Sequence, residues 1–176
     1  MDAQLSAGAT VPADEGRALS PSDFRRFAGQ FATGVAVVTA KGSRGETSGV
    51  TINAVTSLSL DPPLYLVCLD NGSNTLDLVR DSRAFALHFL AKDQSELSCV
   101  FASKQADKFA GVSHAVGVTG SPIIQGVLAV AECVVSQISV MGDHTIVIAE
   151  VKATTVNGGE PLLYHRGAYA ALGDGA

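Results

Sequence analysis

Charged residues and cysteines are scarce in this sequence. Only three of its 176 residues are cysteines, Cys68, Cys99 and Cys133, and their wide spacing argues against a disulfide framework or a Cys-x-x-Cys site. The 12 basic residues are spread thinly and the net charge is -5, so no nucleic-acid partner is predicted. The sequence also has no run of about 18 apolar residues, the length that a membrane helix needs.

Motifs for several common chemistries are missing as well. There is no GxxxxGK[ST] phosphate loop and no GxSxG nucleophile turn. The only GxG, Gly173-Asp174-Gly175, has no helix after it, so a Rossmann nucleotide site is not predicted. The four histidines lie far apart and lack HExxH spacing, so no metal site is predicted. The first residues carry no secretory signal, and the expected location is the cytoplasm.

The composition that remains is that of an ordered globular domain. Hydrophobic residues make up 47% of the chain and charged residues 16%, a balance that argues against disorder. So little charge leaves apolar surface that is expected to pack against a second copy. Residues 1–19 lack periodicity and are predicted to be a flexible tail, which leaves 20–176 as one domain.

Helices are predicted in three places. Ser20 and Pro21 have the order of an N-cap and a first helical residue, and an apolar stripe follows at Phe24, Phe27, Ala28 and Phe31. This helix is expected to end at Gly34. Two further helices are predicted over 74–82 and 93–102, the second beginning with Asp93 and Glu96 at capping-box spacing.

Strands dominate the rest of the chain. Extended segments are predicted over 35–39, 49–60, 64–69 and 84–90, and a long hairpin over 127–140 and 145–155. Strands do not alternate regularly with long helices, so a doubly wound sheet is not favoured. The expected fold is mainly β, a β-barrel with a few flanking helices.

The segment 48–63 is unusually rich in small polar residues. In a strand, one face would hold Thr51, Asn53, Val55, Ser57 and Ser59, and the other a mostly apolar set, Ile52, Ala54, Thr56, Leu58 and Leu60. A flat heteroaromatic ring such as a flavin needs short polar side chains that let it approach the backbone. Taken alone, the pattern is explained more simply by an ordinary solvent-facing strand.

A resemblance to a known family favours the flavin-binding interpretation over that of a solvent-facing strand. The segments Phe31-Ala32-Thr33-Gly34-Val35, Gly49-Val50-Thr51-Ile52-Asn53-Ala54 and Gly142-Asp143-His144-Thr145 occur in order, with Asp61-Pro62-Pro63 and Pro161-Leu162-Leu163-Tyr164 at matching positions. Over residues 22–172 the chain resembles the flavin reductase-like family, the reductase components of two-component flavin monooxygenases. The resemblance implies a split β-barrel homodimer that binds flavin near the subunit interface.

The resemblance also implies which residues bind. Thr51, Asn53 and Ala54 would face the isoalloxazine ring, and Thr56, Ser57 and Ser59 would hold the ribityl chain or the phosphate. The turn Ser73-Asn74-Thr75 opens a predicted helix, whose N-terminus favours a phosphate, and Lys104 or Lys108 could add a charge there, although a solvated surface lysine is the simpler interpretation. His144 would position a nicotinamide. No catalytic residue is expected, because hydride transfer needs only well-placed rings.

The activity implied is NAD(P)H-dependent reduction of FMN or FAD, which would supply reduced flavin to a partner monooxygenase. NADH is favoured over NADPH because no obvious arginine cluster marks a pocket for the 2′-phosphate of NADPH. Two alternatives stay open. One is a flavin-binding protein of the same fold without reductase turnover. The other is an oxidase of a pyridoxine-like vitamer, which would need a basic phosphate pocket that the few arginines do not obviously supply.

Overall fold

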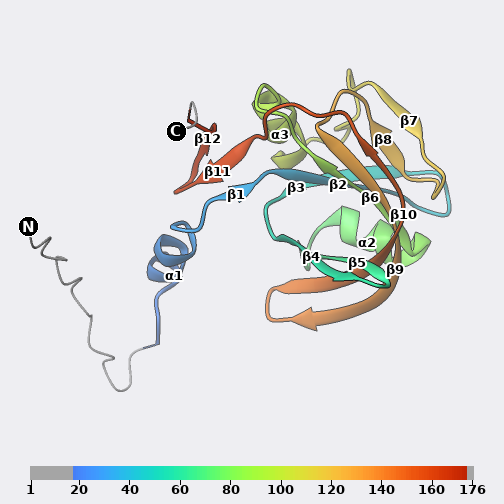
Figure 1. Cartoon of the computed structure of the whole chain (residues 1–176). Coiled ribbons are helices and arrows are strands. Elements are labelled where there is room, and N and C mark those ends of the chain that lie inside the picture. The colour runs from blue at the N-terminus through green and yellow to red at the C-terminus, as the bar shows by residue number, and fades with distance from the viewer. Residues whose placement is uncertain (1–17, 174–176) are drawn as a thin grey trace, which may run out of the picture.

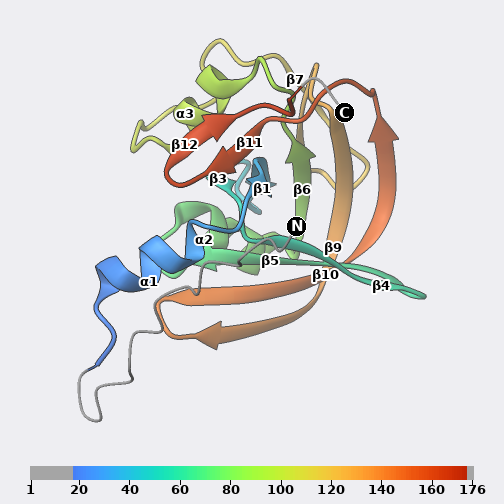
Figure 2. The same ribbon diagram turned by 60° about the vertical axis from the view of Figure 1, so that its left-hand side comes forward.

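The computed structural model describes residues 18–173, so most of the predicted tail lies outside the described residues, as do residues 174–176. A seven-stranded antiparallel sheet forms the body (Figure 1). Its order is β3 (Thr47–Ile52), β2 (Ala36–Lys41), β6 (Ala84–Phe89), β9 (Ala129–Met141), β10 (His144–Val156), β5 (Pro63–Asp70) and β4 (Val55–Leu60). The predicted long hairpin is confirmed as β9 and β10, which curve together in Figure 2.

The sheet is strongly curled but not closed. Its two edge strands, β3 and β4, are consecutive in the chain and are separated only by Asn53 and Ala54. So few residues span at most about 10 Å, which brings the edges together at one corner. Within residues 18–173 these edges do not pair with each other. The mainly β prediction is confirmed, whereas full closure into a split barrel stays a prediction.

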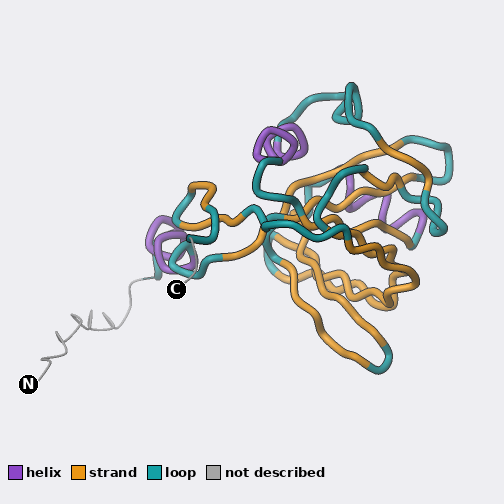
Figure 3. The backbone as a smooth tube through the Cα atoms, turned by 45° about the horizontal axis from the view of Figure 1, so that its top comes forward, coloured by secondary structure: helices purple, strands orange, loops and turns teal. Residues whose placement is uncertain are grey.

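Two smaller sheets lie beside the body. One contains β1 (Thr33–Gly34), β11 (Leu163–His165) and β12 (Ala168–Ala170), and the other contains β7 (His114–Val116) and β8 (Pro122–Ile124). Figure 3 shows the β11–β12 hairpin next to the first helix, at one end of the molecule. The hydrogen bond from the Arg166 N–H to the Gly29 carbonyl, at 3.1 Å, joins the two.

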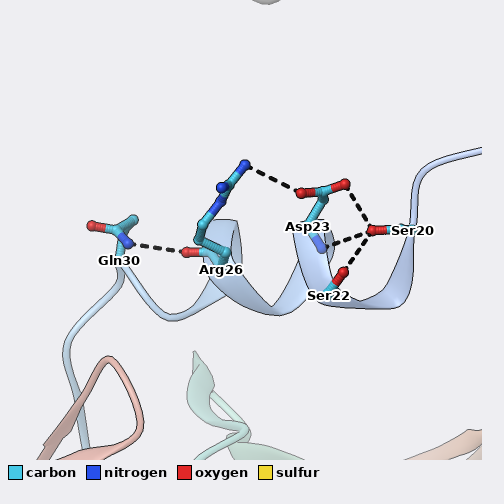
Figure 4. A network of polar contacts seen from close by, with 5 residues as sticks. All are labelled: Ser20, Ser22, Asp23, Arg26 and Gln30. Atoms are coloured by element: carbon cyan, nitrogen blue, oxygen red, sulfur yellow. Dashed lines mark hydrogen bonds and ion pairs between the residues drawn. The ribbon is translucent and has the colours of Figure 1, made fainter.

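The first helix, α1 (Pro21–Ala28), begins as predicted. The Ser20 hydroxyl accepts the Asp23 N–H at 3.1 Å, and Pro21 is the first helical residue (Figure 4). The predicted end at Gly34 is wrong. The helix stops at Gly29, since Thr33 and Gly34 pair with β11 instead. No residue of α1 is buried in the single chain.

The other two helices cover the sheet. The predicted helix 74–82 is confirmed as α2 (Asn74–Ser82), whose Leu76 and Val79 enter the core. α3 (Ser95–Ala102) starts two residues later than predicted, after Gln94. The expected capping box is wrong because the Gln94 side chain accepts the Ala91 N–H at 2.8 Å, and no side chain caps the helix.

Two packed clusters stabilise this arrangement. One lies between the sheet and α2, and the other lies under α3 around Phe101. Within residues 18–173, no helix combines the length and the apolar character that a membrane crossing requires.

The segment 49–60 departs most from expectation. Instead of one strand it forms β3 and β4, which belong to opposite edges and pair with different neighbours. A register shift between Ser57 and Ser59 interrupts β4 further. The predicted alternation of a polar and an apolar face is therefore wrong: Leu58 is 46% exposed and Leu60 92% exposed.

Candidate functional site

The bend between β3 and β4 opens into a cavity of about 660 Å³. Four of the predicted flavin-binding residues line it, Asn53, Ala54, Thr56 and Ser57. The facing wall comes from the segment that leaves α1, and the floor from sheet residues: Ala28, Phe31, Ala32, Thr33, Gly34, Ala36, Val55, Tyr65 and Phe89. The volume lies within the range of small-molecule sites, and the small residues let a flat ring approach the backbone.

One hydroxyl at this cavity lacks a partner. Thr33 Oγ1 is buried and forms no hydrogen bond with the described residues. A buried hydroxyl without a partner is costly, and native proteins rarely keep one without a reason. Because the oxygen is inaccessible even with the cavity empty, a ligand would reach it only after the Thr33 side chain turns. Sequence reasoning assigned Thr33 no role, although it lies within the motif that carries the family resemblance.

A second cavity, of about 640 Å³, lies at the N-terminus of α2. It brings together the other predicted phosphate residues, Ser73, Asn74, Thr75 and Lys104. Ser73 is the N-cap residue but makes no side-chain cap hydrogen bond, and Asn74 and Lys104 are exposed. The buried Thr75 hydroxyl instead lies 2.9 Å from that of Ser48. An anion here would meet free backbone N–H groups and the positive end of the helix, but the carboxylates of Glu46 and Asp70 line the same cavity and oppose it.

Lys108 differs from Lys104 although both line the second cavity. The Lys108 ammonium is partly buried and donates to the carbonyl oxygens of Gly49 at 3.0 Å and Phe101 at 2.9 Å. Burial lowers its pKa. Lys108 therefore joins β3 to α3, which leaves Lys104 as the lysine free to approach an anion.

Thr51 lies in a third, smaller cavity of about 240 Å³, which shares Asn53 with the first. Its hydroxyl donates to the Ser98 carbonyl of α3 at 2.7 Å. The Tyr169 hydroxyl donates to Ser98 Oγ at 2.8 Å from the opposite side. Burial raises the pKa of Tyr169. Because the Thr51 hydroxyl already donates its proton to the Ser98 carbonyl, it can only accept a hydrogen bond from a ligand.

Two predicted residues stand apart. Ser59 lines none of these three cavities in the described part of the chain, and neither does His144. His144 begins β10, opposite Asp70 of β5, and its Nδ1 lies 2.7 Å from the Asp143 carboxylate. The hydrogen bond to His144 lowers the pKa of Asp143. Because Asp70 lines the second cavity, His144 lies on that side of the chain.

The fold and the cavities define the class of this protein. It is a small, mainly β protein in which a cavity large enough for a ring ligand lies at the corner where the sheet edges meet. A separate cavity lies at the N-terminus of α2, the helix end that favours anions. Residues 28–173 match the family model of the flavin reductase like domain. The chain belongs to this family, as the sequence motifs predicted.

Named relatives agree with this assignment. The chain is 42% identical to the "Probable flavin reductase" of Rhizobium meliloti over 149 residues, which cover 85% of this chain but 48% of that protein. It is 34% identical over 157 residues to a flavin-dependent monooxygenase reductase subunit of Mycobacterium tuberculosis, covering 88% and 83% of the two chains. The NADH:FAD oxidoreductase of Streptomyces globisporus, solved with NAD and FAD fragments, superposes with a TM-score of 0.84 at 33% identity, covering 97% and 99%.

Proposed function

We propose that this chain reduces FMN or FAD with NADH and supplies the reduced flavin to a separate monooxygenase. Its membership of the flavin reductase like domain family supports the activity. The name of the Streptomyces globisporus relative supports NADH as donor, and that of the Mycobacterium tuberculosis relative supports a monooxygenase partner. A donor of this kind is available in the cytoplasm, where we expect the protein, and all three cysteines are free, as in a reducing compartment.

The observation that carries the proposal is the first cavity, where Asn53, Ala54, Thr56 and Ser57 come together. A bound flavin supplies a ring that accepts a hydride from a reduced nicotinamide. The exposed Asn53 side chain offers a polar group to the heteroatoms of such a ring, and Ala54 leaves room beside the backbone. Thr56 and Ser57 extend the polar lining along β4. The chain itself binds and orients the ring, and no side chain needs to act as a nucleophile.

The phosphate of the flavin belongs, in this proposal, at the N-terminus of α2. Ser73, Asn74 and Thr75 present hydroxyl, amide and backbone N–H groups there, and Lys104 adds a positive charge. His144 is proposed to position the nicotinamide through its Nε2, since its Nδ1 already contacts Asp143.

A homodimer is part of the proposal. Phe27 and Phe31 on and after α1 are each more than three-quarters exposed, and Leu60 on the edge strand β4 is almost fully exposed. Such residues normally lie in an interface. A second copy packed against α1 and β4 would cover these three side chains and would enclose the first cavity. Light scattering of the purified chain should give twice its mass of 18.0 kDa.

The test of the activity is to mix the purified chain with NADH and FMN or FAD and to follow loss of the nicotinamide absorbance. Turnover without a third substrate is expected. Flavin binding without turnover would favour the alternative of a binding protein.

Variants at the cavity connect activity to structure. Asn53→Leu removes an exposed polar group of the cavity and should weaken flavin binding about tenfold, the worth of one good hydrogen bond in a desolvated site. Thr33→Val removes only an inaccessible hydroxyl and should change the affinity little. Fluorescence titration with FMN measures both, and Thr155→Val, on an exposed position of β10, is the control. Unchanged affinity in Asn53→Leu would mean that the flavin binds elsewhere.

A further inference from the structure

Three arginines that are distant in the sequence meet at one cavity of about 350 Å³. Arg25 and Arg26 come from α1, and Arg166 comes from the turn between β11 and β12. The other lining residues are Gly29, Gln30 and Gly167, so no carboxylate of residues 18–173 lines the cavity. No local sequence pattern groups these arginines, because Arg166 lies far along the chain from the other two, and tertiary structure brings them together.

Gln30 holds the cluster in a defined geometry. Its amide nitrogen donates to the Arg26 carbonyl at 3.0 Å (Figure 4), and its amide oxygen accepts Arg166 Nε at 2.9 Å and also Nη2. One edge of the Arg166 guanidinium is thus fixed. Its remaining N–H groups form no hydrogen bond with the described residues, which leaves them available to a ligand.

Arg166 occupies a backbone conformation that disfavours arginine. Its φ is 51° and that of Gly167 is 83°, in a two-residue hairpin turn where Asn and Gly are the usual residues. A non-glycine residue in the left-handed region is disfavoured. Such a residue is a reason to ask whether its side chain has a function.

The cluster also has excess positive charge. Arg25 forms no ion pair among residues 18–173, and Arg26 pairs only with Asp23, at 3.2 Å, with both side chains exposed. The planar guanidinium matches phosphate oxygens in a bidentate geometry. In a chain with net charge -5, this local excess favours an anionic ligand.

The cluster adjoins the proposed flavin cavity. Ala28 and Phe31 line that cavity, whereas Gly29 and Gln30, between them in sequence, line the arginine cavity. The arginines follow the opposite side of α1 from Phe24 and Phe27. A second copy that covers the phenylalanines would leave the arginines accessible.

We propose that Arg25, Arg26 and Arg166 form a phosphate-binding subsite for the diphosphate of the nicotinamide dinucleotide. This rests on the proposed function, in which the N-terminus of α2 takes the flavin phosphate and the donor's diphosphate is left without a partner. The subsite binds the phosphate-bearing part of the donor and so places its ring near the first cavity.

Direct binding tests the subsite without turnover. Calorimetry with ADP-ribose, which carries the diphosphate but no nicotinamide, compares the wild type with Arg25→Gln and Arg166→Gly. Each variant should bind about tenfold more weakly. Arg166→Gly is informative because glycine suits the turn better than arginine, so its thermal stability should be equal or higher. Arg44→Gln, an exposed arginine on the β2–β3 turn, is the control and should bind as the wild type does.

Kinetics identify the source of the phosphate. In both variants the KM for NADH should rise about tenfold while kcat stays the same. The KM for 1-benzyl-1,4-dihydronicotinamide, a hydride donor without phosphates, should not change. A different result would assign the cluster to the flavin and overturn the donor assignment. In that case the KM for FMN would rise, while the KM for riboflavin and the KM for NADH would stay unchanged.

Failure of the subsite and failure of the proposed function give different results. Wild-type protein that binds ADP-ribose but does not oxidise NADH would overturn the function and retain the subsite. Wild-type turnover together with unchanged ADP-ribose affinity in both variants would overturn the subsite. An equal rise in KM for the phosphate-free donor would also overturn it, because the arginines would then act only on the shape of the cleft.

Discussion

The buried His88 on β6 is expected to make the stability of this protein depend on pH. Its side chain is inaccessible to solvent. Nε2 accepts the Ile124 N–H at 3.1 Å, so the ring proton must be on Nδ1, which lies 3.1 Å from the Val37 carbonyl and donates to it. The neutral ring is fully hydrogen-bonded. A second proton on Nε2 would point at the Ile124 N–H, and the resulting charge would be buried.

The magnitude follows from the pKa. Burial lowers the pKa of His88 from 6.5 to about 4. In the unfolded chain the ring takes up a proton at higher pH than in the folded protein, so acid favours unfolding. The stabilisation is fully present above pH 6.5 and is lost as pH falls through 4. A shift of this size corresponds to about 3 kcal/mol in total, of which about 2 kcal/mol is lost by about pH 5.

Urea unfolding at about pH 7.5 and about pH 5 measures this effect. His88→Gln keeps an acceptor for Ile124 but cannot titrate. Between the two pH values the wild type should lose about 2 kcal/mol more of its free energy of unfolding than the variant does. His114→Gln changes an exposed histidine and should leave the pH dependence of the wild type intact. An identical pH dependence in the wild type and His88→Gln would refute the reasoning.

Two further variants test the packing of β3 and the nicotinamide role. In Gly49→Ala, the new Cβ would lie 2.5 Å from the ring of the buried Phe101, so urea unfolding should show a loss of about 1–3 kcal/mol; a neutral result would mean that the helix can move away. His144→Ala should raise the KM for NADH and leave FMN affinity unchanged, because the side chain lines neither the first cavity nor the second, where the flavin phosphate is proposed to bind. Steady-state kinetics and a flavin titration separate the two constants, and an unchanged KM would remove the role of His144.

Local sequence signals predicted most elements correctly, since each acts within a few residues. The Ser20-Pro21 pair marks the start of α1, and the apolar spacing of 74–82 gives α2 with the predicted bounds. The β-branched run at 35–39 gives β2, the apolar segments 64–69 and 84–90 give β5 and β6, and the β9–β10 hairpin turns at Gly142, where φ is 64°. Element ends were less well predicted, because tertiary pairing decides them, as with Gly34 in β1.

The family resemblance predicted several residues of the candidate site but not how they are arranged. Of the residues it named, Asn53, Ala54, Thr56 and Ser57 line one cavity. It treated Thr51 as a neighbour on the same surface, whereas the bend in the chain turns Thr51 toward α3. No local pattern reports such a bend, since it depends on β3 pairing with β2 and β4 pairing with β5.

The sequence by itself determined the family, the mainly β composition and the short polar residues near one corner, since these depend on residue identity and nearby spacing. Tertiary structure alone decided that β3 and β4 lie at opposite edges of the sheet, that Thr33 Oγ1 is buried without a partner among the described residues and that Arg25 meets Arg166. The physical reason is distance along the chain: residues about 140 positions apart become neighbours only when the β11–β12 turn packs against the end of α1.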